Sequence, residues 1–309
     1  MRFMKAKKSK PSAAAVNVRL VSKPIRRCFP IFMLPTFLAF CIGFLWPFAQ
    51  GLYLSFCKFT IPQDATFVGF SNYITVLKDA GFRYAFGYTT LFAVVSILAI
   101  NILSFLVAYF LTQNIKGSNI FRTVFFMPNL IGGIVLGYIW SMIFDGILKR
   151  YGTFLLAETK YGFWGLLILM CWQQVGYMMI IYIAGLQSIP EDMIEAAKID
   201  GASKWQTLWR ITIPNVMSSV TICVFLTLTN SFKLFDQNLA LTGGAPTSFG
   251  ADGTMVNTTE MLALNIYKTF YTGANSRGIA QAKAVLFFVL VAVLALAQLK
   301  FTREKEVQQ

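Results

Sequence analysis

Residues 195–214 read EAAKIDGASKWQTLWRITIP and separate two long apolar stretches of the chain. They lie in a polar connection, 188–214, whose residues favour two short helices joined by a turn. Gly201 suits the left-handed backbone conformation in which many helices end. Pro214 lacks a backbone N–H, so it marks the end of the second helix. The sequence therefore predicts a helix–turn–helix in this connection.

Both predicted helices carry a start signal. Ser188 with Glu191, and Ser203 with Gln206, have the spacing of a capping box, in which two side chains satisfy free backbone groups at the first turn. Pro190 is expected in the first turn of the first helix, where its missing N–H costs nothing.

The two helices present different faces. Ala196 and Ala197 leave a flat surface of small side chains that a partner can approach closely. The second helix has an apolar face that we expect to anchor it beneath the other helices: Trp205, Leu208, Trp209 and Ile211. This pattern suits docking in a groove of a partner protein, or else an amphipathic connector lying on lipid headgroups.

The composition is that of a membrane protein. Hydrophobic residues make up 56% of the chain and charged residues 13%, against about 25% charged residues in soluble domains. A helix needs roughly 20 apolar residues to cross a bilayer. Six stretches qualify: 29–57, 86–112, 121–144, 163–187, 215–235 and 281–301. We therefore expect an all-α polytopic membrane protein with six transmembrane helices.

Two of these stretches are interrupted. Pro128, Gly132 and Gly133 break the helical pattern of the third, and the polar segment 230–236 interrupts the fifth. Lys233 and Asp236 within that segment predict an ion pair near the outer interface.

The net charge of +14 is distributed so that it orients the chain. Cytoplasmic segments are enriched in Lys and Arg, and every charged residue before the first stretch is basic: Arg2, Lys5, Lys7, Lys8, Lys10, Arg19, Lys23, Arg26 and Arg27. The charge thus indicates membrane topology, with both termini in the cytoplasm, and no nucleic-acid partner. A cleaved signal peptide, the rival explanation, would have an apolar region of only about 7–15 residues.

The predicted organisation follows from these stretches. It comprises a basic cytoplasmic tail (1–28), a first transmembrane helix with an external segment (29–85), a core of five transmembrane helices (86–301) and a cytoplasmic tail (302–309). Helical patterns also occur in the external segments, at FVGFSNYITVL (67–77) and, within the external loop 237–280, at TEMLALNIYKTFY (259–271).

The sequence lacks the residues that metal binding, nucleotide binding and catalysis usually require. The chain contains no histidine, and its five cysteines show no metal-ligand spacing. No Gly-Lys dipeptide occurs, so the Walker A motif that cradles nucleotide phosphates is absent from the sequence. We expect no catalytic residue, no metal site and no cofactor bound by this chain.

Glu-Ala-Ala at 195–197, Gly201 and the Ile-x-Ile-Pro at 211–214 resemble the EAA loop of permease subunits of binding-protein-dependent ABC importers. The one departure is Ile213, where that family usually has Leu. The resemblance covers roughly residues 30–301 and implies the type I ABC importer permease fold. It also implies docking on a separate ATPase through Glu195, Ala196, Ala197, Asp200, Gly201 and Pro214.

Three further segments are similar to the carbohydrate branch of that family, the maltose and glycerol-phosphate type: YIAGLQSIPEDMIEAAKIDGA (182–202), MPNLIGG (127–133) and LTGGAP (241–246). This similarity implies a sugar importer of the bacterial cytoplasmic membrane. Its implied partners are an ABC ATPase dimer that holds ATP and Mg, a second and distinct permease subunit, and an extracytoplasmic sugar-binding protein that meets the external loops.

Polar side chains within apolar stretches tend to mark transport pathways. The candidates for lining a substrate path are Asn129, Gln173, Gln174, Tyr177, Asn230 and Ser231. Amides can hydrogen-bond the hydroxyl groups of a neutral sugar, and aromatic rings can stack on its C–H faces. Glycerol phosphate is the alternative substrate. The resemblance to the maltose type favours Asn129, Gln174 and Tyr177. The alternative is that these amides only bond neighbouring helices.

An ion-coupled secondary transporter of a small polar solute is the alternative function. It predicts ionisable residues along an intramembrane path, and these are nearly absent from the middle of the apolar stretches. A membrane-embedded enzyme is disfavoured because no catalytic constellation is recognisable.

Overall fold

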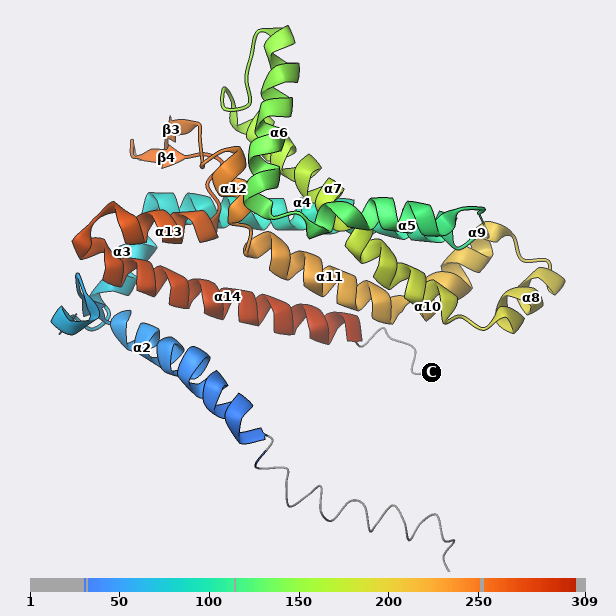
Figure 1. Ribbon diagram of the computed structural model, residues 1–309, viewed down its shortest axis with the longest axis horizontal. Coiled ribbons are helices and arrows are strands. Elements are labelled where there is room, and N and C mark those ends of the chain that lie inside the picture. Colours follow the sequence, from blue (N-terminus) through green and yellow to red (C-terminus); the bar gives the residue numbers. More distant parts are fainter. Residues whose placement is uncertain (1–30, 32, 114, 251–252, 304–309) are drawn as a thin grey trace, which may run out of the picture. The chain divides into compact units, whose positions relative to one another are not determined.

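The computed structural model describes residues 31, 33–113, 115–250 and 253–303 (Figure 1). The predicted basic tail 1–28 lies outside the described residues, as does most of the tail 302–309. The chain divides into two units, residues 1–54 and 55–309, which are considered separately.

In the first unit the described residues form one apolar helix, Met33–Leu54. It contains a π-helical turn, Cys41–Leu45, followed by α2 (Trp46–Leu54). Its side chains are exposed almost throughout, and a helix that is apolar on all sides needs an apolar environment around it. This helix confirms the first predicted crossing, 29–57, with narrower bounds.

The second unit is mainly helical. Its helices are α3 (Ser71–Lys78), α4 (Ala80–Leu111), α5 (Ser118–Phe126), α6 (Gly133–Leu148), α7 (Thr159–Gln187), α8 (Glu191–Ile199), α9 (Lys204–Thr207), α10 (Ile213–Asn215), α11 (Met217–Phe232), α12 (Asp236–Leu241), α13 (Leu262–Thr272) and α14 (Arg277–Arg303). Its strands form two antiparallel pairs, β1 (Cys57–Lys58) with β2 (Thr66–Phe67) and β3 (Thr247–Phe249) with β4 (Met255–Asn257).

The predicted crossings are recovered as four long helices and two bent pairs. Met33–Leu54, Ala80–Leu111, Thr159–Gln187 and Arg277–Thr302 are each long and apolar enough to span a membrane, and the number among the described residues rises to six when each bent pair is counted as one span. The all-α polytopic fold is confirmed. Helices α3 and α13 also confirm the two helical patterns predicted in the external segments.

The interruptions predicted in the third and fifth crossings are present. In the third, Ser118–Leu130 and Gly133–Tyr151 meet at an angle of 100°, so the predicted break at Pro128, Gly132 and Gly133 is confirmed. Pro128 lies in a 3₁₀ turn, and Ile131 and Gly132 have extended backbones, because proline cannot donate within a helix. In the fifth, α11 ends at Phe232 and α12 begins at Asp236.

The core of the second unit lies between α4, α7 and α11. Helix α4 packs along α7, and α11 packs on both α4 and α14. Fully buried side chains from these helices, including Phe92, Ile100, Met178 and Tyr182, form the largest apolar cluster.

Glycines set how closely the helices approach. A Cβ at Gly176 of α7 would lie 1.8 Å from the carbonyl oxygen of Phe125, so α5 crosses α7 in backbone contact. On α6, a Cβ at Gly137 would lie 2.5 Å from the Cβ of Ala240, which brings α6 against α12. Small residues allow this kind of close packing between membrane helices.

Replacing Gly176 by alanine is expected to destabilise the protein, because the added methyl group would push α5 off α7. Overpacking of this kind costs about 1–3 kcal/mol. Gly146→Ala is the matched control, since nothing lies within 4 Å of that position on α6. Thermal denaturation in detergent should show a lower midpoint for Gly176→Ala only; equal midpoints would contradict the backbone contact.

Candidate functional site

The connection 188–214 folds as the two predicted helices, α8 and α9 (Figure 1). Helix α8 ends in a Schellman motif, in which the N–H of Ala202 donates to the carbonyl of Ala197 at 2.9 Å and that of Gly201 to Lys198 at 3.1 Å. Gly201 has φ +74°, the left-handed conformation that glycine adopts without strain. The predicted helix end at Gly201 is confirmed.

Of the two predicted start signals, one is correct. At α9, the N–H of Ser203 donates to Oε1 of Gln206 at 2.8 Å, and the N–H of Gln206 donates to Oγ of Ser203 at 3.2 Å. The capping box at Ser188 is wrong, because α7 continues to Gln187 and Ser188 donates its hydroxyl to the carbonyl of Gly185 at 2.8 Å.

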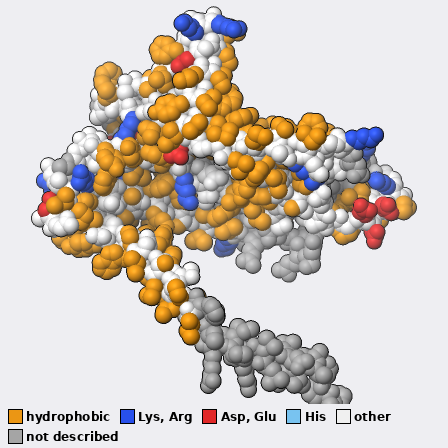
Figure 2. Space-filling model, viewed as in Figure 1, with side chains coloured by type: hydrophobic (Ala, Val, Ile, Leu, Met, Phe, Trp, Pro, Cys, Tyr) orange, Lys and Arg blue, Asp and Glu red, His pale blue; other side chains and the backbone are white. Residues whose placement is uncertain are grey.

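The beginning of α8 also differs from the prediction. Pro190 stands immediately before the helix, at the N-cap position, and not in its first turn. Glu191 and Asp192 occupy the first turn, where negative charge is favourable next to the free N–H groups. Figure 2 shows acidic side chains gathered at the right of the view, where Figure 1 places α8.

The faces of the two helices differ partly from the prediction. Ala196 is exposed, whereas Ala197 is 7% exposed and packs inside the unit, so only one of the two alanines offers a surface. Trp205 and Trp209 are 67% and 53% exposed and contact each other edge to face at 5.5 Å. The predicted anchoring face is therefore wrong for both tryptophans, which share the outward side of their helix.

The other predicted coupling residues lie along the same loop. Glu195 and Asp200 are exposed on α8 and at its end, and Pro214 is half-buried in α10. A π-helical turn, Leu208–Thr212, precedes the proline, because Pro214 has no N–H to bond the carbonyl four residues earlier. The helix bends by 68° after Asn215, so it ends just beyond Pro214.

Gln173 of α7 lies at the break between α5 and α6. Its Nε2 donates to the carbonyl of Ile131 at 3.2 Å, and its Oε1 accepts from Nε2 of Gln237 on α12 at 2.7 Å. Gln173 is 5% exposed. In this conformation the amide therefore joins the broken helix to α12 and does not face an open path.

The other candidate lining residues lie in different surroundings. Gln174 is half-buried and accepts from Nδ2 of Asn230 at 3.3 Å, a bond between α7 and α11. Tyr177 is half-buried against the core, and Asn129 is half-buried on the 3₁₀ turn. Ser231 is fully buried, and its Oγ has no hydrogen-bond partner among the described residues.

A buried polar cluster that the sequence analysis did not identify lies in the core. Oδ1 of Asn101 on α4 accepts from the hydroxyl of Tyr182 on α7 at 2.8 Å, and its Nδ2 donates to Oγ1 of Thr227 on α11 at 3.3 Å. The signal was present, because Asn101 is an amide within the long apolar stretch 86–112.

The ion pair predicted between Lys233 and Asp236 is absent from the described structure, in which both side chains are exposed. The backbone ceases to be helical between them, so the helical spacing on which the prediction rested does not apply. Among the described residues, no group of His, Cys, Asp or Glu could hold a metal ion.

Residues 100–305 match the family described as the binding-protein-dependent transport system inner membrane component. The chain belongs to this family. It is therefore a membrane-spanning permease of a transport system, and the resemblance seen in the EAA loop is confirmed.

Relatives of this permease include transporters named for sugars. It is 41% identical over 286 residues to the probable starch degradation products transport system permease protein AmyD of Thermoanaerobacterium thermosulfurigenes, covering 90% of this chain and 94% of that protein. It is 30% identical over 276 residues to the multiple sugar-binding transport system permease protein MsmF of Streptococcus mutans, covering 86% and 92%.

The fold of the permease is shared with a solved transporter. A chain in the crystal structure of a bacterial ABC transporter that imports the acidic polysaccharide alginate superimposes with a TM-score of 0.75, covering 92% of this chain and 98% of that one, at 21% sequence identity. The type I importer permease fold is confirmed.

Gln173→Leu is expected to destabilise the permease, because it removes both bonds that join the α5–α6 break to α12. The expected loss is about 1–3 kcal/mol for two hydrogen bonds. Gln174→Leu is the control, since it removes one longer bond at a half-buried position. The midpoint of thermal denaturation should be lower for Gln173→Leu than for Gln174→Leu. The reverse order would contradict the bridging role of Gln173.

Proposed function

We propose that this permease is one of the membrane-spanning subunits of an ATP-driven importer for a neutral sugar or oligosaccharide. It forms half of the translocation path in a bacterial cytoplasmic membrane, with both termini in the cytoplasm. The observation that carries the proposal is the 41% identity, over nearly the whole chain, to a permease named for starch degradation products.

The loop 188–214 supplies the coupling to a separate ATPase dimer, which binds ATP and Mg. Its shape is held by bonds within the loop, the Schellman motif at Gly201 and the capping box at Ser203. It exposes Glu195 and Ala196, and Ile199 is 85% exposed nearby. A rigid loop with an exposed apolar surface suits docking in a partner's groove.

The substrate path runs beside the junction of α7 with α11 and the α5–α6 break. Gln174, Tyr177, Asn230 and Asn129 are half-buried there, so small movements of the helices would expose amides and a ring to it. Neutral amides favour a hydroxylated, uncharged solute, because an anion or an amino acid would need a fixed countercharge. Malto-oligosaccharides are the first substrates to test.

The importer contains two further kinds of partner. A second, distinct permease subunit completes the path, and an extracytoplasmic sugar-binding protein delivers the substrate to the external loops. The binding protein is in keeping with a family named for its dependence on such proteins.

A pull-down of the tagged chain from its native membrane in mild detergent, followed by mass spectrometry, tests this assembly. We expect an ATPase with a Walker A motif, a second permease with its own EAA loop, and a binding protein. A homodimer with no second permease would refute the distinct partner. Recovery of the chain alone, transporting in liposomes without ATP, would instead support an ion-coupled transporter.

Gly201→Val is expected to weaken coupling by about tenfold or more while leaving membrane insertion intact. A β-branched residue at φ +74° is strained by roughly 1–2 kcal/mol, which is about tenfold in an equilibrium. Uptake and substrate-stimulated ATP hydrolysis of the assembled complex measure the effect. Gly201→Asn is the control, because asparagine tolerates this conformation. Normal stimulated hydrolysis in Gly201→Val would count against the coupling role.

A further inference from the structure

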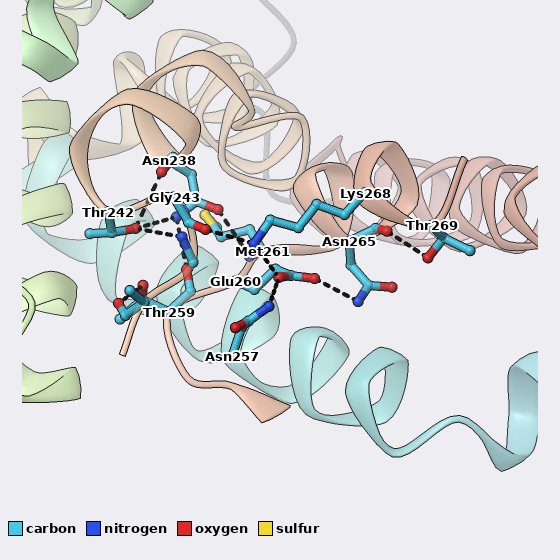
Figure 3. A network of polar contacts seen from close by, with 12 residues as sticks. Asn238, Thr242, Gly243, Asn257, Thr259, Glu260, Met261, Asn265, Lys268 and Thr269 are labelled. Carbon is cyan, nitrogen blue, oxygen red and sulfur yellow. Dashed lines mark hydrogen bonds and ion pairs between the residues drawn. The ribbon is translucent and has the colours of Figure 1, made fainter. Parts of the chain in front are cut away.

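Glu260 lies at the centre of a polar network at the end of the external loop that joins α12 to α13 (Figure 3). Its side chain is almost fully buried, at 5% exposure. Oε1 accepts from Nδ2 of Asn265 at 2.7 Å and Oε2 from Nζ of Lys268 at 2.9 Å, and Asn257 also donates its amide to Oε2. A buried carboxylate is stable only when donors surround it in this way.

Lys268 connects this carboxylate to the glycine-rich stretch LTGGAP. Its Nζ donates to the carbonyl of Gly243 at 2.6 Å. Gly244 has φ +88°, and a Cβ there would lie 3.0 Å from Nζ of Lys268 and 3.1 Å from Oε2 of Glu260. Glycine suits position 244 because the backbone there has a positive φ and passes directly over the Glu260–Lys268 ion pair.

The network continues from Asn265 to the ends of two spanning helices. Oδ1 of Asn265 accepts from Nζ of Lys283 on α14 at 2.8 Å. Lys283 is 2% exposed and forms an ion pair with Oδ2 of Asp79 at 2.6 Å. Oδ1 of Asp79 in turn accepts from the N–H of Gly81 at 2.9 Å, capping the start of α4.

Asn238 of α12 attaches the same loop on its other side. This residue is fully buried; its Nδ2 donates to the carbonyl of Thr259 at 2.8 Å, and its Oδ1 accepts from the N–H of Met261 at 3.1 Å. The next N–H, of Leu262, donates to Oγ1 of Thr89 on α4 at 2.9 Å. In Figure 3, Asn238, Thr259 and Glu260 lie close to one another at this loop.

Loops are generally more mobile than the elements that they connect. Here two successive ion pairs, Glu260–Lys268 and Asp79–Lys283, tie the loop to α4 and α14 through Asn265. These ion pairs and hydrogen bonds fix the external loop to the spanning helices. A displacement of the loop is therefore transmitted to those helices.

We propose that Glu260 is a positioning residue which, through Lys268, holds the external loop in the shape that the binding protein engages during transport. The inference rests on the proposed function, since it takes the binding protein as the loop's partner. It assigns to LTGGAP and to the buried charges a shared role in presenting that surface, with no contact to the transported sugar.

The test uses the whole transporter, reconstituted in liposomes with its ATPase, second permease and binding protein, and malto-oligosaccharides as the probe. Glu260→Gln removes the charge and keeps a similar shape. Lys268→Met removes the same ion pair from its other side, at a side chain that is 35% exposed, and leaves Asn257 and Asn265 donating to Glu260. Glu158→Gln is the matched control, because the Glu158–Lys160 pair is exposed at 52% and 59%.

In both network variants, we expect the binding-protein concentration for half-maximal stimulation of ATP hydrolysis to rise roughly tenfold, as loss of one charge-assisted hydrogen bond implies. Basal hydrolysis and the maximal stimulated rate should stay unchanged, and Lys268→Arg, which keeps the positive charge and N–H donors, should shift the half-saturating concentration less than Lys268→Met does. The control should match the wild type.

Three results would overturn the positioning role. These are an unchanged half-saturating concentration in both variants, a loss of basal hydrolysis in an assembled complex, or failure of both variants to assemble while the control does. If only Glu260→Gln fails to assemble, Lys268→Met decides the outcome. A wild-type complex that the binding protein does not stimulate at all would instead refute the proposed function.

Discussion

The backbone contact between α5 and α7 is the constraint on which the rest of the core depends. At Gly176 the carbonyl of Phe125 fills the space that any side chain would occupy. Gln173 lies three residues earlier, on the same face of α7, so this contact brings its amide to the carbonyl of Ile131 at the helix break. A broken helix in lipid needs such a partner, since unbonded backbone groups there are costly.

The same physics explains why several candidate pocket amides bond neighbouring helices. Helix association in lipid gains little from the hydrophobic effect and depends on close packing and interhelical hydrogen bonds. Asn101 with Tyr182, and Gln174 with Asn230, are bonds of this kind. An amide can serve both purposes if the helices move, and the half-buried Gln174 is better placed for this than the buried Gln173.

The loop 188–214 and the loop between α12 and α13 are stabilised differently. The loop 188–214 holds its shape through bonds between residues close in sequence, and its tryptophans and Ile199 remain exposed. The external loop depends on buried charges from distant segments, with Lys283 on α14 paired to Asp79 before α4. Local bonds leave a surface free for a partner, whereas long-range ion pairs fix a loop to the helices beneath it.

The sequence by itself determined the features that arise from local geometry and composition. These include the number and approximate place of the apolar helices, the break near Pro128, the left-handed helix end at Gly201 and the capping box at Ser203. Each depends on residues within a few positions of one another, through missing donors, allowed backbone angles or the length needed to cross a bilayer. The family resemblance also rested on such a local motif.

Only the tertiary structure decided which distant residues meet. The angle of 100° at the break, the outward tryptophans and the occupied amide of Gln173 all depend on how helices pack. The pair of Lys283 with Asp79 was likewise invisible, because nothing in either local sequence indicates the other. Periodicity predicts which face of a helix is apolar, but the neighbour that covers it is set by packing between segments far apart in the chain.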